Sequence, residues 1–297
     1  MTGDTQPIEQ LPLLDDENSG EQELSTTDER ELKKRANDLD GASWTRNSIS
    51  IWSDIRKNRE EIELGHPAIF PSQLVTRLIE SFTRNTEQYI LDPFCGSGST
   101  VVAASRMGRI GIGFEINQDY IDLANRRLMT RDLWQPDAGS ESRIIKDDAR
   151  NLLEHLDPES IDMVITSPPY WDVLSQRRTA DNKNIRDYGK TVEDLGKIAD
   201  YHAFLDELAT TFTAVFTALR PSKYCAVVVM DLRKKNVFYP FHSDVAEMMK
   251  RIGFIYDDLI IWDRRHEYNN LRPLGFPAVF RVNKVHEFIL LFQKPKV

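Results

Sequence analysis

Short apolar runs alternate with amphipathic segments along most of the chain, which indicates strands interleaved with helices. The strands are predicted at Tyr89–Asp92, Ile110–Glu115, Arg143–Ile145, Ile161–Thr166, Tyr224–Met230, Leu259–Trp262 and Glu287–Gln293. The helices are predicted at Gln73–Phe82, Thr100–Arg106, Asp119–Leu128, Tyr201–Leu219 and His242–Arg251. This alternation predicts an α/β fold, a three-layer αβα sandwich.

The first predicted strand leads into a glycine-rich turn and then a helix, as in the first βα unit of nucleotide-binding folds. Small residues in the turn, from Pro93 to Ser99, let a ligand approach the backbone. The next strand ends on Glu115, about twenty residues after the glycines, where a ribose-binding acid is expected. Gly98 is followed by Ser99 rather than by the lysine of a phosphate-binding Walker loop, which favours a nucleoside over a triphosphate.

A second motif, Thr166-Ser167-Pro168-Pro169-Tyr170-Trp171, closes the most apolar of the predicted strands. Each proline fixes φ and lacks an N–H, so the turn offers a hydroxyl and carbonyl oxygens as acceptors beside an aromatic face. Such a turn suits a planar base that carries an exocyclic amine.

Together these motifs resemble the amino-methyltransferases of DNA, which methylate the exocyclic nitrogen of cytosine or adenine with S-adenosylmethionine. The likeness extends from Trp52 to Gln293 and includes the segment His66–Pro71. It implies a Rossmann-like, seven-stranded class I methyltransferase sheet whose last strand is antiparallel to its neighbours and follows a hairpin at Glu267–Asn283. The motif order is the reverse of the one common among enzymes with this Asp-Pro-Phe-x-Gly-Ser-Gly wording.

The resemblance also implies the roles of individual residues. Cofactor binding would fall to Asp92, Phe94, Gly96, Ser97, Gly98, Glu115, Asp148 and Ala149, with Glu115 on the ribose and the turn Asp147-Asp148-Ala149 at the adenine. The catalytic motif would be Ser167, Pro168, Pro169 and Tyr170. In it, the Ser167 side chain and the Pro168 carbonyl would accept the amine hydrogens while Tyr170 stacks on a base flipped out of double-stranded DNA. Methyl transfer would be direct, without a metal.

The identity of the target base stays open between two nitrogens. Serine at the first position of the motif is typical of cytosine-N4 enzymes, so N4-cytosine is the prediction and N6-adenine the alternative. Cytosine carbon-5 is disfavoured because neither Cys95 nor Cys225 stands in a Pro-Cys setting. An RNA base methyltransferase and an inactive binding protein are further alternatives, although no common RNA-binding signature is present.

Charge is distributed unevenly along the chain. Residues 1–32 contain ten acids and one base, so the rest of the chain holds 37 of each and is neutral. We therefore expect an acidic, disordered tail over 1–43 and a catalytic domain over 44–297. The insert 172–200 and the hairpin 264–284 are candidate recognition elements.

We expect clusters of two or three basic residues in the neutral part to contact DNA phosphates. They are Arg177-Arg178, Lys183 with Arg186, Arg233-Lys234-Lys235, Arg264-Arg265, and Arg281 with Lys284. Two cysteines and the lack of a leader or a long apolar run predict a cytoplasmic protein with no membrane span. The expected setting is restriction-modification, with or without a cognate endonuclease.

Overall fold

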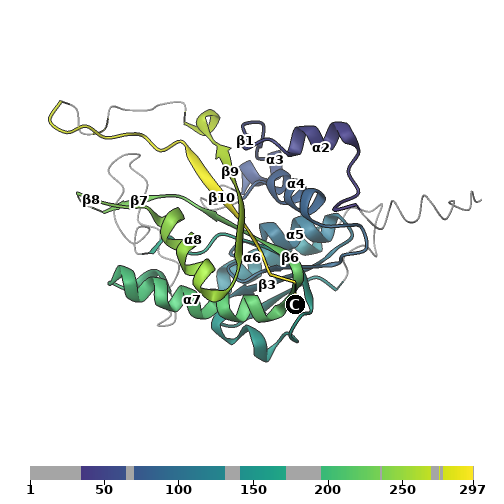
Figure 1. Cartoon of the computed structure of the whole chain (residues 1–297). Coiled ribbons are helices and arrows are strands. Elements are labelled where there is room, and N and C mark those ends of the chain that lie inside the picture. Colours follow the sequence, from purple (N-terminus) through teal and green to yellow (C-terminus); the bar gives the residue numbers. More distant parts are fainter. Residues whose placement is uncertain are drawn as a thin grey trace, which may run out of the picture. The chain divides into compact units, whose positions relative to one another are not determined.

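The computed structural model describes residues 35–64, 70–130, 141–171, 195–234, 236–268, 274 and 277–296. One compact unit, Ala36–Val297, is built on an eight-stranded sheet (Figure 1). Its strands are β1 (Ile51–Trp52), β2 (Tyr89–Asp92), β3 (Ile110–Glu115), β4 (Arg143–Lys146), β5 (Ile161–Thr166), β6 (Leu219–Val229), β9 (Ile255–Asp263) and β10 (His286–Gln293). The strand order is β1-β9-β10-β6-β5-β2-β3-β4. β10 is antiparallel to both of its neighbours, and the remaining pairs are parallel.

The Rossmann-like class I sheet is confirmed, including its antiparallel last strand. Two features go beyond the predicted seven strands. The two-residue strand β1 extends the sheet beside β9, and β7 (Leu232–Lys234) pairs with β8 (Val237–Tyr239) in a separate hairpin. No strand occurs in the described part of 267–283, so the hairpin predicted there is not seen in those residues.

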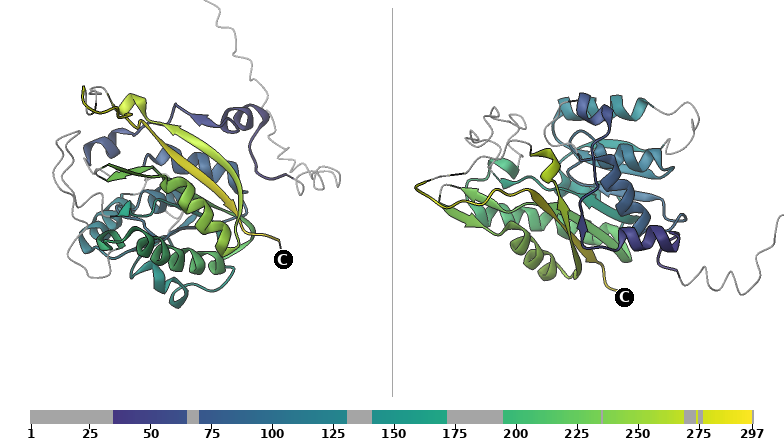
Figure 2. Two further views of the ribbon diagram at one scale, coloured as in Figure 1. Left: turned by 60° about the vertical axis from the view of Figure 1, so that its left-hand side comes forward. Right: turned by 90° about the horizontal axis from the view of Figure 1, so that it is seen from above.

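Helices cover both faces of the sheet (Figure 2). The α-helices are α2 (Gly41–Asn47), α3 (Arg59–Glu63), α4 (Ser72–Phe82), α5 (Ser99–Arg106), α6 (Gln118–Met129), α7 (Tyr201–Ala218) and α8 (Phe241–Ile252). Short 3₁₀ turns are η1 (Ala149–Glu154), η3 (Leu195–Lys197) and η4 (Arg265–Glu267). Helices α4, α5 and α6 lie on one face, and η1, α7 and α8 lie on the other. The predicted tail boundary at 43/44 falls inside α2.

The alternation of side chains along each strand divides the core into two layers. Ile90 and Met163 pack with α4 and α5, whereas the adjacent Leu91 and Val164 pack with α7 and α8. All four side chains are fully buried. Apolar residues on both faces of a parallel sheet produce the continuous apolar runs seen in the sequence. Among the described residues, none of the helices is long and apolar enough to cross a membrane.

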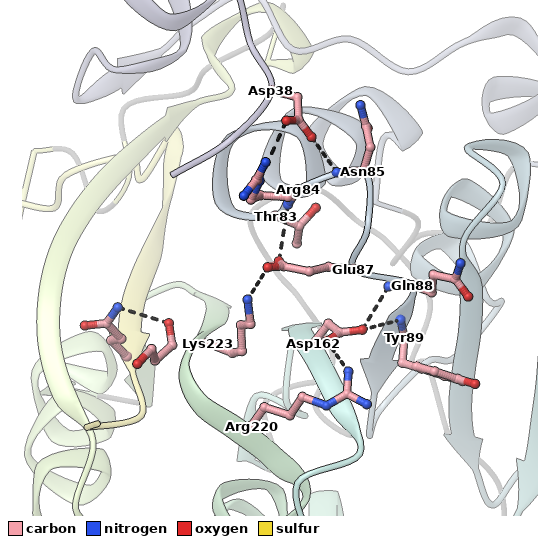
Figure 3. Close-up of polar contacts among 12 residues, drawn as sticks. Asp38, Thr83, Arg84, Asn85, Glu87, Gln88, Tyr89, Asp162, Arg220 and Lys223 are labelled. Atoms are coloured by element: carbon pink, nitrogen blue, oxygen red, sulfur yellow. Dashed lines mark hydrogen bonds and ion pairs between the residues drawn. The ribbon is translucent and has the colours of Figure 1, made fainter. Parts of the chain in front are cut away.

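A set of ion pairs joins segments at the amino end of β2 and β5 (Figure 3). The buried Asp162 carboxylate accepts hydrogen bonds from the backbone of Gln88 (2.8 Å) and Tyr89 (3.0 Å) and pairs with Arg220. Nearby, Glu87 pairs with Lys223, and Asp38 accepts the backbone N–H of Asn85. These contacts stabilise the amino-terminal edge of the parallel strands, opposite to their carboxyl ends.

Candidate active site

A cavity opens where β2, β3 and β5 end, at the carboxyl edge of the sheet. This is where ligands bind in open α/β sheets. It is lined by Phe70, Asp92, Pro93, Phe94, Cys95, Gly96, Ser97, Ser99, Phe114, Glu115, Ile116, Tyr120, Asp147, Asp148, Ala149, Ser167, Pro168, Pro169, Tyr170 and Leu195. The structure thus brings together eleven of the twelve site residues predicted from the sequence. The exception is Gly98, which does not line the cavity.

Gly98 allows the glycine-rich loop to pack closely against α6. Its φ is +78°, in the left-handed region, and it is the residue before the first turn of α5. A Cβ at this position would lie 2.7 Å from the Cβ of Ala124 on α6, so only glycine lets the two segments pack this closely. Arg127, also on α6, donates a 2.7 Å hydrogen bond to the Ser97 carbonyl and braces the turn.

Asp92 is a buried anchor for the loop. Its carboxylate accepts hydrogen bonds from Thr166 Oγ1 (2.6 Å), Thr100 Oγ1 (2.7 Å) and the backbone N–H of Phe94 (3.1 Å). Burial raises the pKa of Asp92 to about 6, and these hydrogen bonds oppose the rise. The carboxylate is therefore engaged within the protein, where it joins the glycine-rich turn to the strand that leads into the Ser167–Tyr170 turn.

Glu115 presents a carboxylate at the end of β3. Its Oε1 accepts the backbone N–H groups of Ile116 (2.9 Å) and Asn117 (2.8 Å), which fix the side chain from the protein side. Burial raises the pKa of Glu115 to about 6, against these backbone bonds. A fixed, partly desolvated carboxylate is well suited to accept hydrogen bonds from a diol.

The acidic turn after β4 serves two structural purposes as well as lining the cavity. Asp148 caps η1 by accepting the backbone N–H of Arg150 (2.9 Å), and it also pairs with the Arg150 guanidinium (2.6 Å). Asp147 binds His155 Nε2 at 2.6 Å, and this contact is the main cause of the lowered pKa of Asp147. Both carboxylates are thus oriented before any ligand arrives.

The motif Ser167–Tyr170, predicted to be catalytic, follows the end of β5 at Thr166. Ser167 Oγ donates to the hydroxyl of Tyr170 (3.3 Å), which donates in turn to Glu287 Oε2 (3.2 Å). Trp171 has a φ of +46° and donates a hydrogen bond from Nε1 to the Ile198 carbonyl at 2.8 Å. The turn is therefore held at both ends, with Ser167, Pro168, Pro169 and Tyr170 facing the cavity.

Sequence reasoning did not single out four residues of this region. Ile116, Tyr120 and Leu195 line the cavity, and Glu287 contacts Tyr170. The first two follow Glu115 closely, so their position after the strand was a usable signal. Leu195 and Glu287 come from distant segments, and no local pattern marks them.

Both cysteines are buried, and burial raises the pKa of each thiol well above its usual value. A buried thiol of this kind is a poor nucleophile, which agrees with the case against carbon-5 chemistry. In the described ranges, no group of three His, Cys, Asp or Glu side chains could hold a metal ion.

Some predicted elements lie outside the described residues. These are residues 1–34 of the predicted acidic tail, His66 to Ile69, most of the insert 172–200 with its basic residues, Lys235, and Asn269, Asn270 and Arg272 of the predicted hairpin. Arg264 is described, and it is not placed to contact phosphate. Its side chain is 17% exposed and is paired with Glu267 and Glu287.

A protein-family model for DNA methylases matches residues 13–126 and 161–297. The Type II methyltransferase M.ScaI of Streptomyces caespitosus is 46% identical over 64 residues, which make up 22% of this chain and 21% of M.ScaI. The Type II methyltransferase M.MjaI of Methanocaldococcus jannaschii is 29% identical over 178 residues, 54% of this chain and 58% of that protein. The chain thus matches less than two thirds of the length of each relative.

A solved structure from Thermus thermophilus, of a proposed DNA modification methylase complexed with S-adenosyl-L-methionine, is 30% identical to the chain. The similarity covers 50% of this chain and 54% of that one, with a TM-score of 0.36.

Proposed function

The chain belongs to the DNA methylase family, and on that basis we propose that it transfers a methyl group from S-adenosylmethionine to the N4 amine of cytosine in DNA. One observation carries the proposal. The acceptor-rich turn Ser167–Tyr170 shares a single cavity with Glu115 and Asp148, so a nucleoside cofactor and a base can meet there.

The lining fits S-adenosylmethionine in its chemistry. Glu115 would accept hydrogen bonds from the ribose hydroxyls. Asp148 would accept a hydrogen bond from the adenine through the carboxylate lone pairs that its pairing with Arg150 does not use. Phe94 and Ala149 would pack on apolar parts of the cofactor. When bound, the cofactor supplies an electrophilic methyl group on a sulfonium. Asp92, Gly96 and Ser97 would hold the loop in the shape that receives it.

The exocyclic amine of a base is a weak nucleophile because its lone pair is delocalised into the ring. Acceptors that hold both N–H groups favour the pyramidal geometry in which the lone pair is available. The Ser167 hydroxyl and the Pro168 carbonyl are the acceptors in this turn, and both residues line the cavity. Tyr170 would stack on a base flipped out of the duplex, an extrusion that costs a few kcal/mol.

Serine at the head of the motif supports N4-cytosine as the target over the alternative, N6-adenine. Asp or Asn at this position is typical of adenine-N6 enzymes, whereas serine is typical of cytosine-N4 enzymes. Double-stranded DNA is the proposed substrate, and an RNA base remains the less favoured alternative. The cytoplasm and a restriction-modification system, with or without a cognate endonuclease, are the proposed setting.

A basic and aromatic surface beside the site supports contact with DNA. Phe280 is 89% exposed and lies next to Arg281 in the segment that leads to β10. On the β7–β8 hairpin, two cations lie over the Phe238 ring: the Arg233 guanidinium is 5.4 Å and the Lys284 ammonium 4.6 Å from the ring centroid. We name these residues, Arg233, Phe238, Phe280, Arg281 and Lys284, the basic arm. Cations beside exposed rings suit phosphates and unstacked bases.

The decisive experiment identifies the product. The full chain is incubated with labelled S-adenosylmethionine and mixed-sequence duplex DNA, with RNA of the same sequences in parallel, and the nucleosides are analysed by mass. We expect N4-methylcytosine in the DNA. N6-methyladenine would contradict the base assignment, and label in RNA alone would contradict the substrate.

A further inference from the structure

Glu287 is buried next to the catalytic turn, and the mechanism above does not use it. We propose that Glu287 is a positioning residue that sets the direction of the hydrogen bonds through Tyr170, so that Ser167 meets the target amine purely as an acceptor. The proposal rests on the proposed role of Ser167. It assigns a function to a residue 117 positions from Tyr170 in the sequence.

The fold explains how this residue reaches the site. β10 is antiparallel to β6, while β6 is parallel to β5. The start of β10 therefore lies at the same edge of the sheet as the carboxyl end of β5. Glu287 is the second residue of β10, and Tyr170 follows the end of β5 by four residues.

Glu287 is held as a carboxylate by its surroundings. Its side chain is 7% exposed, and Oε1 is paired with Nη1 of Arg264. The same guanidinium pairs with Glu267 at 2.5 Å and lies over the Trp262 ring, 4.7 Å from its centroid. A buried carboxylate with an arginine partner is ionised, and an ionised carboxylate can only accept hydrogen bonds.

The direction of the chain of bonds follows from this. Tyr170 has one hydroxyl hydrogen, and Glu287 Oε2, at 3.2 Å, can only accept it. The Tyr170 oxygen must then accept the hydrogen of Ser167 Oγ, which lies 3.3 Å away. Burial raises the pKa of Tyr170 well above its usual value, so the hydroxyl keeps its hydrogen at neutral pH.

The direction of these hydrogen bonds determines what Ser167 offers to a ligand in the cavity. With its only hydrogen committed to Tyr170, Ser167 Oγ has lone pairs alone to offer to a ligand. In the reverse direction the Ser167 hydrogen would be free to point into the cavity, where it would repel an amine N–H. Glu287 thus selects the one arrangement that the amine requires.

The test measures single-turnover methyl transfer by four variants of the full chain: Ser167→Ala, Tyr170→Phe, Glu287→Gln, and Tyr170→Phe combined with Glu287→Gln. Gln keeps the size of Glu287 but can donate as well as accept. We expect Glu287→Gln to lower the rate about tenfold, with unchanged affinity for S-adenosylmethionine and DNA. In the Tyr170→Phe background the same change should add almost nothing, because the connecting hydroxyl is already absent.

The outcomes separate this proposal from the one on which it rests. Full activity of Ser167→Ala would contradict the acceptor role of Ser167 itself. Impaired Ser167→Ala together with a fully active Glu287→Gln, or with equal losses from Glu287→Gln in both backgrounds, would overturn only the role of Glu287. Should Glu287→Gln fail to fold because Arg264 loses its partner, Tyr170→Phe still decides, since it leaves the ion pair intact. A wild-type rate in Tyr170→Phe would then overturn the proposal.

Discussion

Thr166 Oγ1 donates a 2.6 Å hydrogen bond to Oδ1 of Asp92, although the two residues are 74 positions apart. Thr100, at the start of α5, donates to the other oxygen of the same carboxylate at 2.7 Å. One buried acid therefore joins the ends of β2 and β5 and the start of α5. These are the three segments on which the cofactor loop and the catalytic turn are built.

Replacing Asp92 with Ala leaves two buried threonine hydroxyls without their acceptor. We expect the free energy of unfolding to fall by about 1–3 kcal/mol for each unsatisfied group. Denaturant unfolding of the variant measures this loss, and Asp92→Asn, which keeps an acceptor, is the matched control with a smaller effect. Equal stability of Asp92→Ala and the wild type would show that the carboxylate is not an anchor.

The raised pKa of Asp92, about 6 against an ordinary 3.8, gives this stability a pH dependence. The folded state binds the proton more tightly than the unfolded state, so the part of the stability that depends on protonation of Asp92 is fully present below about pH 4 and is lost as the pH rises through about 6. The unfolding free energy of the wild type relative to Asp92→Asn should therefore fall between pH 4 and 6 and level off above. A difference that stays constant over this range would contradict the assignment.

Glu115 should give cofactor binding its own pH dependence. Its pKa is raised to about 6 by burial, and ribose hydroxyls donate to the ionised form. Affinity for S-adenosylmethionine, measured by calorimetry, should increase from pH 5 to 7 and then stay constant. Glu115→Gln should bind more weakly and without this dependence. If the affinity of Glu115→Gln depended on pH as steeply as that of the wild type, a group other than Glu115 would be responsible for the pH dependence.

The ion pairs at the opposite edge of the sheet should affect stability without affecting chemistry. Asp162→Ala leaves two backbone N–H groups and Arg220 without their buried partner, and we expect a loss of about 3–5 kcal/mol. Glu247→Ala, which breaks an exposed pair with Lys250, should leave the free energy of unfolding nearly unchanged. Below its melting temperature, Asp162→Ala should retain the wild-type rate of methyl transfer per folded molecule. A lower rate would place this network in the mechanism.

The basic arm should contribute to DNA affinity through phosphate contact. Arg281→Ala should weaken DNA binding and reduce the slope of log affinity against log salt by about one. Arg126, an exposed arginine on α6, provides the matched control, and Arg126→Ala should leave both quantities unchanged. Fluorescence anisotropy over a salt series measures them. If the two variants had the same DNA affinity and the same salt dependence, Arg281 would not contact DNA.

Much of the fold could be predicted because strands that are buried on both faces have continuous apolar sequences. β2, β3 and β5 begin and end where the sequence indicates. β6 and β9 begin several residues earlier than predicted, since Arg220 and Lys223 interrupt the first pattern and Asp257 and Asp258 interrupt the second. The β7–β8 hairpin is short and partly exposed, and it leaves no such run.

The composition of the cavity was equally accessible to sequence reasoning, because motifs at the ends of adjacent parallel strands meet at one edge of the sheet. The residues that contact those motifs could not be predicted from the sequence. Asp148 is committed to Arg150, and Tyr170 is committed to Glu287 through a strand placed by the topology. Arg264 has the charge of a phosphate ligand, but its two acidic partners come from different segments.

In the proposed mechanism, the Ser167 hydroxyl holds the target amine for methyl transfer. The most direct test is the single-turnover rate of Ser167→Ala on DNA, measured alongside its affinity for S-adenosylmethionine. We predict a rate lower by ~10²-fold, as for the loss of a pre-organised polar contact, with cofactor affinity and melting temperature unchanged. A wild-type rate in a folded, cofactor-binding Ser167→Ala would show that this hydroxyl does not hold the amine.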